Sequence, residues 1–214
     1  MTTIPDTENK RIRILQAGVK VFGRSGLERG KIADVAEEAG IGKGTVYEYF
    51  RSKEKLFIAI VDSFFVEIFQ YMDTILSTNK TPVHKITALI DYSFDFLDQH
   101  LQSEDADSWP IIMEIFTQSM RAEIGDDIHQ TLIKELRLLK DVIEPTLQEG
   151  IDAGQLRSTS PEYYSIVLFA ALDGLALHYY LQRDRLDIKK MKKAAHDLFL
   201  NGMLTTTGRK ELQL

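Results

Sequence analysis

The chain has 214 residues, of which 44% are hydrophobic and 27% are charged, and it contains no cysteine. This composition is that of an ordinary globular protein with a buried core, and it excludes a disordered chain. Because cysteine is absent, disulfide bonds, thiolate metal sites and a cysteine nucleophile are excluded. The first twenty residues lack a long apolar run followed by a cleavage site, so we expect no signal peptide and a cytoplasmic protein.

The net charge of −6 is unevenly distributed along the chain. Residues 1–55 hold 11 Lys or Arg against 8 Asp or Glu, a balance of +3. Residues 56–214 hold 15 basic against 24 acidic residues, a balance of −9. A basic segment on an acidic body favours binding of a polyanion through one face of the molecule.

Helical spacing of apolar residues recurs along the chain without tandem repeats or strand-like alternation, so we expect an all-α fold. The first helix is expected over about residues 8–24, with Gly26 past its end. Short helices over about residues 31–39 and 43–50 follow, joined by Gly40-Ile41-Gly42. Their lengths match a helix-turn-helix, whose second helix enters the major groove of DNA.

A long helix is expected from its N-cap, Ser52, to about Leu76. It would join a smaller N-terminal domain, residues 1–52, to a larger helical domain, residues 53–214. Pro145 lacks a backbone donor, so we expect the helix that contains it to kink or split near Val142. The further helices expected up to that point cover about residues 82–101, 109–124 and 126–153, with a loop at 103–108.

The most apolar segment runs from Tyr163 to Leu181, and a helix over about residues 187–204 follows it. Nineteen residues approach the length that crosses a membrane, but Asp173 and His178 would be costly in lipid, so we favour a buried helix and no membrane. Because the other helices can cover only one flank, we expect the other flank to pack against a second copy in a four-helix homodimer interface. The residues predicted at this interface are Ala170, Ala171, Gly174, Leu177 and Leu181.

Residues 26–56 read GLERGKIADVAEEAGIGKGTVYEYFRSKEKL. They contain Asp34-Val35-Ala36, the turn Ala39-Gly40-Ile41, Lys43-Gly44-Thr45-Val46-Tyr47, Tyr49-Phe50, and Ser52-Lys53-Glu54 with Leu56. Through these motifs the first sixty or so residues resemble TetR-type transcriptional regulators, the tetracycline-repressor-like family, while the remainder is similar only in length and helical pattern. The resemblance implies an all-α homodimer that binds a palindromic operator on double-stranded DNA, with a body that usually holds a small-molecule inducer. Residues 1–52 are then the DNA-binding domain, and residues 53–214 are the ligand-binding and dimerisation domain.

The resemblance also implies the residues that contact DNA, some on base edges and some on phosphates. Helical geometry supports this assignment, because at about 100° per residue Phe50 lies near Val46 on a buried side, with Gly44 on the outer side. The residues assigned to bases or phosphates are Lys43, Thr45, Tyr47 and Tyr49, with Lys53 as a phosphate clamp.

Glu48 is an acid on the outer side of the same helix, about 200° from Val46. One interpretation is that it accepts a hydrogen bond from a cytosine amino group. The other is that it is solvated or pairs with Arg51 or Ser52. The sequence favours neither interpretation.

The segment departs from the family pattern at two places. Gly30-Lys31 stands where the family usually has Thr-Thr, and Gly42 stands where it usually has Ser or Thr. Glycine can cap a helix but offers no hydroxyl to a phosphate, so backbone amides with Arg29 and Lys31 would have to compensate. Ala33 occupies a position that reads a base in some relatives, so its contact is expected to be apolar or missing.

Aromatic and methionine side chains of the body are candidates for an apolar or aromatic inducer site, because such sites need few polar groups. For each of them core packing is the competing interpretation, and we favour it. Asp173 and His178 are the two we expect to be buried, and bonds to neighbouring hydroxyls compete with a ligand role for them. The ligand candidates are Phe69, Met72, Tyr92, Phe96, Trp109, Met113, Phe116, Asp173 and His178.

The five histidines are scattered, without metal-binding spacing, and no glycine-rich phosphate loop follows a strand. We therefore expect no enzyme, no metal site and no cofactor. We favour a ligand-responsive transcriptional regulator that an inducer releases from DNA, and we favour repression over activation. The alternatives are a DNA-binding architectural or protein-partner module without a small ligand, and an α-helical enzyme with an incidental basic segment.

Overall fold

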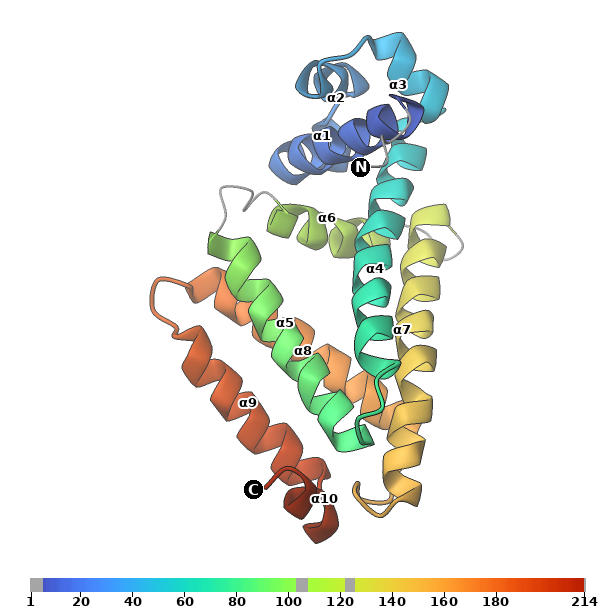
Figure 1. Ribbon diagram of the computed structural model, residues 1–214. Helices are drawn as coiled ribbons and strands as arrows, with labels where there is room; N and C mark the ends of the chain where they lie inside the picture. The colour runs from blue at the N-terminus through green and yellow to red at the C-terminus, as the bar shows by residue number, and fades with distance from the viewer. Residues whose placement is uncertain (1–5, 103–107, 122–125, 214) are drawn as a thin grey trace. The chain divides into compact units, whose positions relative to one another are not determined.

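The computed structural model describes residues 6–102, 108–121 and 126–213, and of residues 6, 7, 99–102, 108 and 109 it describes the backbone alone. In these ranges the chain forms helices and one isolated β-bridge between Leu156 and Leu204, without a strand (Figure 1). The expected all-α fold is confirmed.

The chain divides into two compact units. Unit 1 comprises Met1–Glu67 with Glu104–Glu135, and unit 2 comprises Ile68–Ser103 with Leu136–Leu214. Helices α4 (Lys53–Leu76) and α7 (Asp127–Asp152) begin in unit 1 and end in unit 2. Unit 1 extends past the helix-turn-helix, and the functional boundary after residue 52 stays a prediction.

Unit 1 is built around α1 (Asp6–Arg29), which packs against both α2 (Ile32–Ala39) and α6 (Ser108–Arg121). Helix α3 (Lys43–Tyr49) packs on α2, and the first part of α4 follows it (Figure 1). Their apolar sides meet in one core. Its most completely buried side chains include Ile14, Phe22, Val35, Val46, Leu56 and Phe57.

Helix α1 is interrupted at Gly26, whose φ of 71° lies in the left-handed region that favours glycine. One more helical turn follows, in which the amide of Gly30 donates to the carbonyl of Gly26 at 3.0 Å. The sequence therefore located the break correctly but missed this turn. Two other expectations fall outside the described residues: most of the 103–108 loop, and the end of the next helix at Ile124.

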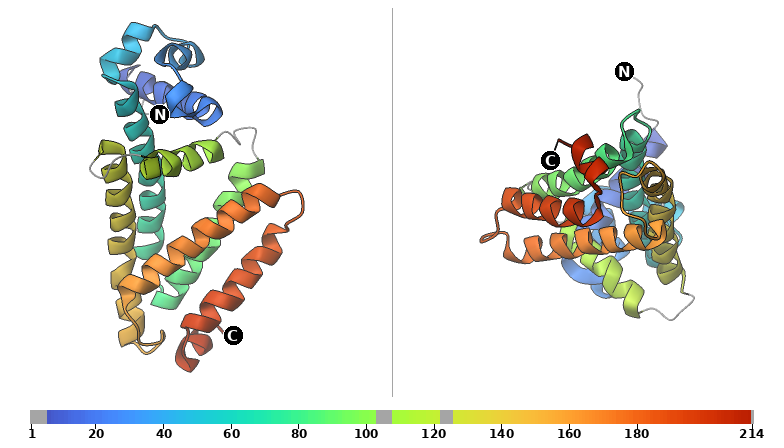
Figure 2. Two further views of the ribbon diagram at one scale, coloured as in Figure 1. Left: turned by 180° about the vertical axis from the view of Figure 1, so that it is seen from behind. Right: turned by 90° about the horizontal axis from the view of Figure 1, so that it is seen from below.

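Unit 2 contains α5 (Pro82–Gln102), α8 (Pro161–Gln182) and α9 (Ile188–Met203), with the ends of α4 and α7. Helix α5 packs against α8 and α9, which run side by side (Figures 1 and 2). The last helix, α10 (Thr206–Glu211), was not predicted, and its N-cap Thr205 accepts from the Gly208 amide at 3.2 Å. A threonine followed by basic residues in the last turn was the signal for it.

Helix α7 passes through Pro145 without a break, so the predicted split near Val142 is wrong, and the alternative, a kink there, stays a prediction. Pro145 cannot donate to the carbonyl of Asp141, but both residues are exposed, and water can satisfy that carbonyl. Ile143 and Leu147, on either side of the proline, are fully buried and hold both halves of the helix in the core.

Helix α8 is less covered than its composition suggests. By length and composition it is the one described helix that could cross a membrane, which is weak evidence because core helices of soluble proteins share these properties. Asp173 and His178 are exposed, so the expectation that they are buried is wrong for the chain by itself. The cause is that unit 2 covers one side of α8 and leaves large apolar side chains in water on the other.

Candidate nucleic-acid interface

The turn between α2 and α3 depends on Gly40, which adopts the left-handed conformation with φ 63° and ψ 40°. Its amide donates to the Glu37 carbonyl, and the amide of Ile41 donates to the Ala36 carbonyl, both at 3.0 Å. This pattern terminates a helix sharply and satisfies its last carbonyls. Arg13 of α1 adds a side-chain donor to the carbonyls of Ala39 and Gly40, which fixes the turn on α1.

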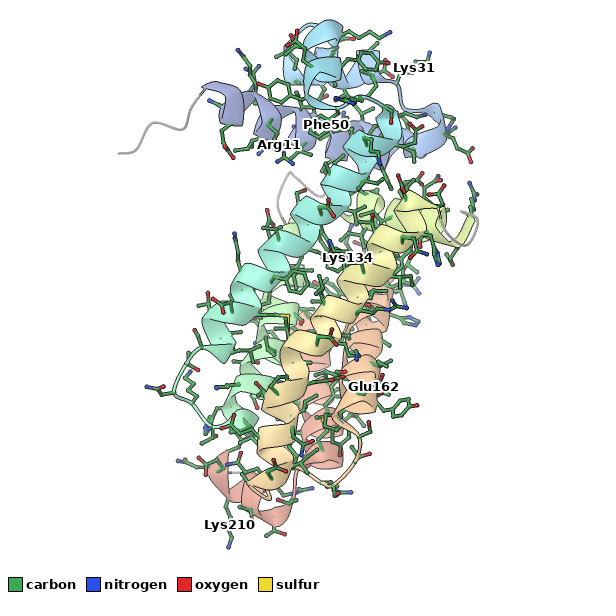
Figure 3. All side chains as sticks on the ribbon, turned by 90° about the vertical axis from the view of Figure 1, so that its right-hand side faces the viewer. Arg11, Lys31, Phe50, Lys134, Glu162 and Lys210 are labelled. Atoms are coloured by element: carbon green, nitrogen blue, oxygen red, sulfur yellow. The ribbon has the colours of Figure 1, made fainter. Side chains whose placement is uncertain are left out.

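Helix α3 separates a buried side from an outer side, as helical geometry predicted. Val46 is fully buried and Phe50 nearly so. Figure 3 shows Phe50 beside Arg11 of α1, whose guanidinium carbon lies 5.8 Å from the centre of the phenyl ring. The outer residues Lys43, Gly44, Tyr47 and Glu48 are exposed, and Thr45 and Tyr49 are half-buried.

At two glycines of this surface, Gly42 and Gly44, the packing of the protein leaves room for a side chain. A Cβ built on Gly44 would meet no atom within 4 Å, and one on Gly42 would meet only the Thr45 hydroxyl at 3.9 Å. Gly30 differs, because a Cβ there would lie 2.7 Å from the ring of Phe22. The departure at Gly30 therefore has a packing reason, whereas Gly42 and Gly44 leave open space at the outer surface.

Three of the predicted DNA-binding cations, Arg29, Lys31 and Lys43, are exposed. Lys31 is exposed at the start of α2 (Figure 3), and Ala33, two residues further along, is exposed too. The Lys43 ammonium lies 5.9 Å from the centre of the Tyr47 ring, a cation–π contact that restrains both side chains. Arg29 donates to the Ser25 carbonyl at 3.2 Å and is exposed.

Lys53, the predicted phosphate clamp, donates to the carbonyl of Glu28 at 3.1 Å and thereby caps the end of α1. Ser52 caps α4 as predicted, since its hydroxyl accepts from the Lys55 amide at 3.2 Å. Backbone donors at this helix start, with the Ser52 hydroxyl, lower the pKa of Glu54. The Lys55 ammonium also pairs with Asp127 at 2.7 Å, which ties the start of α4 to the start of α7.

A contact that the sequence analysis missed links α6 to α1. The Glu114 carboxylate accepts from the Leu27 amide at 2.6 Å and from the Gln118 side chain at 2.8 Å. The Leu27 amide is free to be bound because Gly26 interrupts α1 just before it. Arg121, the last residue of α6, pairs with Glu28 at 3.3 Å. No sequence motif marks this contact, because its partners are 87 residues apart.

The predicted inducer residues divide between the two units. Met113 and Phe116 are half-buried in α6 of unit 1, and the Trp109 side chain lies outside the described residues. In unit 2, Tyr92 stacks on Tyr71 with ring centres 3.2 Å apart and lies 5.8 Å from the ring of Phe96. Tyr71 was missed. The other candidates in unit 2 are Met72, which is buried, Phe69, which is half-buried, and Asp173 and His178, which are exposed.

The predicted dimer residues lie on the less covered side of α8. Ala170 and Leu181 are exposed, whereas Ala171, Gly174 and Leu177 are half-buried. Other large apolar side chains of unit 2 are exposed as well and were not predicted as interface residues. An apolar sequence does not show which side of the helix the core will leave uncovered. The exposed side chains include Tyr163, Ile166 and Val167 of α8 and Leu198 of α9.

Comparisons with known proteins bear on this surface and on the whole chain. The family model for bacterial regulatory proteins of the tetR family matches residues 14–60. The chain is 32% identical over 162 residues to the HTH-type transcriptional repressor KstR2 of Mycolicibacterium smegmatis, covering 72% of each chain. It is 21% identical over 197 residues to the fatty acid metabolism regulator protein of Bacillus subtilis, covering 91% of this chain and 95% of that protein.

A solved structure of similar fold is the transcriptional regulator FadR from Bacillus subtilis in complex with stearoyl-CoA. The match has a TM-score of 0.72 at 18% identity and covers 89% of this chain and 98% of FadR, so it speaks to the fold alone. The relatives that match are transcriptional regulators, not enzymes. Identity to a helix-turn-helix repressor over most of both chains, with the match at residues 14–60, establishes that the chain belongs to the tetR family of bacterial regulatory proteins.

Proposed function

We propose that this regulator is a repressor that binds a palindromic operator as a homodimer in the cytoplasm and leaves it when a small molecule binds the body. The observation that carries the DNA-binding part is the outer side of α3. It presents a polar, partly cationic surface, while Val46 and Phe50 fasten its inner side to the core.

The outer surface of α3 suits a major groove in shape as well as in chemistry. Gly44 leaves room for close approach, and Tyr47 and Thr45 offer hydroxyls to bases or phosphates. Around it, Arg29, Lys31, Lys43 and Lys53 provide the charge for phosphates. Ala33 would add at most an apolar contact.

The homodimer is supported by the exposed apolar side of α8. Val167 is 61% exposed and Leu181 is 67% exposed, which is costly for large side chains in water. Gly174 has no atom within 4 Å of a built Cβ, so a second helix could approach closely there. Two copies related by a two-fold axis would cover both faces and present two α3 helices to the two halves of a palindrome.

Release by an inducer would act through α4, because this helix begins beside the helix-turn-helix and ends in unit 2. The two α3 helices of a dimer must lie about 34–36 Å apart, or a multiple of that distance, to enter major grooves on one side of the DNA. A small shift of α4 would therefore suffice to weaken binding, and coupling of about 1–3 kcal/mol is usual. The stacked aromatic side chains of unit 2 favour a ligand with a large apolar part.

A titration of full-length protein on the duplex upstream of its own coding region tests the proposal. We expect saturable, salt-sensitive binding that is lost on Lys43→Ala and Tyr47→Ala, followed by release with one member of a panel of acyl-CoAs and aromatic compounds. Absence of binding to this duplex and to a random duplex library at low salt would overturn the DNA-binding function. Binding that no compound weakens would instead favour the module without a small ligand.

A further inference from the structure

Glu48 is the single acid in α3, and its position on the outer surface requires an explanation. Its side chain is exposed and has no hydrogen-bond or ion-pair partner in the described part of the chain. Neither pairing that would have made it an ordinary surface residue is present in the described part of the chain, because no ion pair joins Glu48 to Arg51 and no hydrogen bond joins it to Ser52. A free carboxylate on a DNA-facing helix is repelled by phosphates, so it lowers affinity for every sequence.

The surroundings of Glu48 leave its carboxylate open to a base edge. Helical side chains lean toward the N-terminus, which directs Glu48 over Gly44, one turn earlier on the same side. Gly44 has no side chain, and no atom lies within 4 Å of a Cβ built on it. The neighbouring Tyr47 ring is drawn toward the Lys43 ammonium, 5.9 Å from its centre, which holds both side chains in place. Gly44 and Glu48 therefore form a notch with a carboxylate at its rim.

We propose that Glu48 sets the sequence preference of this regulator by accepting a hydrogen bond from the N4 amino group of a cytosine in each half-site. An ionised carboxylate is an acceptor only. Guanine and thymine present acceptors in the major groove, and adenine presents its amino donor beside the N7 acceptor, so cytosine is the base edge that suits it best. The inference rests on the proposed DNA-binding function and identifies the base that the α3 surface selects.

Selection of bound duplexes from a randomised library, with full-length protein, gives the preference directly. Wild type should select a half-site with one C·G pair that Glu48→Ala does not require. Glu48→Gln should select A·T at that pair, because an amide can both accept from and donate to adenine. Discrimination by wild type against other pairs should be about tenfold, the usual cost of one mismatch.

The control variant is Glu37→Gln, which removes the same charge from an exposed side chain of α2. It should leave the selected half-site unchanged, so any general gain in affinity from lost repulsion is separated from a change in preference. Unfolding curves check that the Glu48 variants remain folded, which is expected because Glu48 is exposed and forms no hydrogen bond or ion pair in the described part of the chain.

A second measurement replaces the selected cytosine by N4-methylcytosine, which still pairs with guanine but loses its amino hydrogen in the major groove. Wild type should lose affinity about tenfold on this duplex, whereas Glu48→Ala should bind both duplexes equally. Selection of the same half-site by wild type and Glu48→Ala, or equal wild-type binding to both duplexes, would overturn the role of Glu48. Absence of any DNA binding by wild type would overturn the proposed function itself.

Discussion

The glycines of the helix-turn-helix are required on different physical grounds, and these grounds determine the effect of substituting each one. Gly40 needs its left-handed backbone and Gly30 needs the space that the Phe22 ring leaves, so both belong to the fold. Gly44 is constrained by neither backbone nor packing. Its lack of a side chain is therefore evidence about something outside the protein.

Gly44→Ala separates folding from binding. In the exposed helix, alanine should be neutral or raise the free energy of unfolding by up to about 1 kcal/mol. In the proposed complex the added methyl group would hold α3 away from the base edges and lower DNA affinity several-fold. Denaturant unfolding and binding anisotropy measure the two effects.

The matched control is Gly202→Ala in α9, where a built Cβ also meets no atom within 4 Å. It should change stability in the same direction and leave DNA binding unchanged. Loss of affinity in this control, or full affinity in Gly44→Ala, would contradict the close approach of α3 to DNA.

The residues of the helix-turn-helix could be predicted from sequence because local signals specify them. Val46 and Phe50 lie four residues apart on one side of a short helix, and a glycine turn precedes it, so the outer side follows from geometry. Asp173 and His178 could not be placed in this way. Their exposure depends on which side of an apolar helix the rest of the chain covers, and nothing in the local pattern encodes that.

At the scale of elements, the contact between α1 and α6 combines a broken helix with a carboxylate that satisfies the freed amide. Glu114→Ala should leave the part-buried Leu27 amide without its acceptor, at a cost of about 1–3 kcal/mol in unfolding free energy. Glu114→Gln keeps an acceptor oxygen and should recover most of this loss. Thermal unfolding, with hydrogen exchange of the Leu27 amide, measures both.

Arg121→Ala is the control for charge in the same helix. Its ion pair with Glu28 is exposed on both sides, so its loss should cost less than about 1 kcal/mol. Equal destabilisation by Arg121→Ala and Glu114→Ala would contradict the claim that the bond from the Leu27 amide to Glu114 stabilises the fold more than an exposed ion pair.

Element boundaries were predictable where a cap or a break marks them. Ser52 and Gly40 are such signals, and α4 and α2 begin or end beside them. The continuity of α7 through Pro145 was not predictable, because it depends on long-range burial of Ile143 and Leu147. Helix α10 is short and is held by contacts between Thr205 and the Gly154 and Gln155 carbonyls, about fifty residues away, so its pattern alone was too weak.

At the scale of the whole molecule, the exposed side of α8 should govern the oligomeric state. Val167→Glu places a charge on a side chain that is 61% exposed in the chain by itself, so the fold should tolerate it. In the proposed dimer the same charge would be buried without a partner, and the protein should become a monomer in analytical ultracentrifugation. Val66→Glu, the same change at an exposed valine of α4, should leave the oligomeric state unaltered.

Asp173 makes stability depend on pH. The residue retains exposed surface in the chain by itself, but partial burial removes water from its carboxyl and raises the pKa of Asp173 from 3.8 to about 6. The folded state therefore binds this proton more tightly than the unfolded state, and Asp173 costs stability as pH rises from about 4 to 6 and above.

Asp173→Asn removes this cost. Its melting temperature should exceed that of wild type at pH 7.5 and approach it near pH 3, where the wild-type carboxyl is mostly protonated in both states. Asp184→Asn, which removes an exposed carboxylate just beyond α8, serves as the control for lost charge. An equal difference at both pH values for Asp173→Asn would contradict the water-poor surroundings of this carboxyl.

The uncovered side of α8 has a consequence for gene dosage. In the proposed function only the dimer binds both half-sites of the operator. At total protein concentrations below the dimer dissociation constant, the concentration of dimer rises with the square of the concentration of chains. While the operator is far from saturated, a twofold change in expression then alters its occupancy about fourfold. Tyr163, Val167 and Leu181 would thus set not only which chains meet, but how steeply the regulated genes respond to the supply of their own regulator.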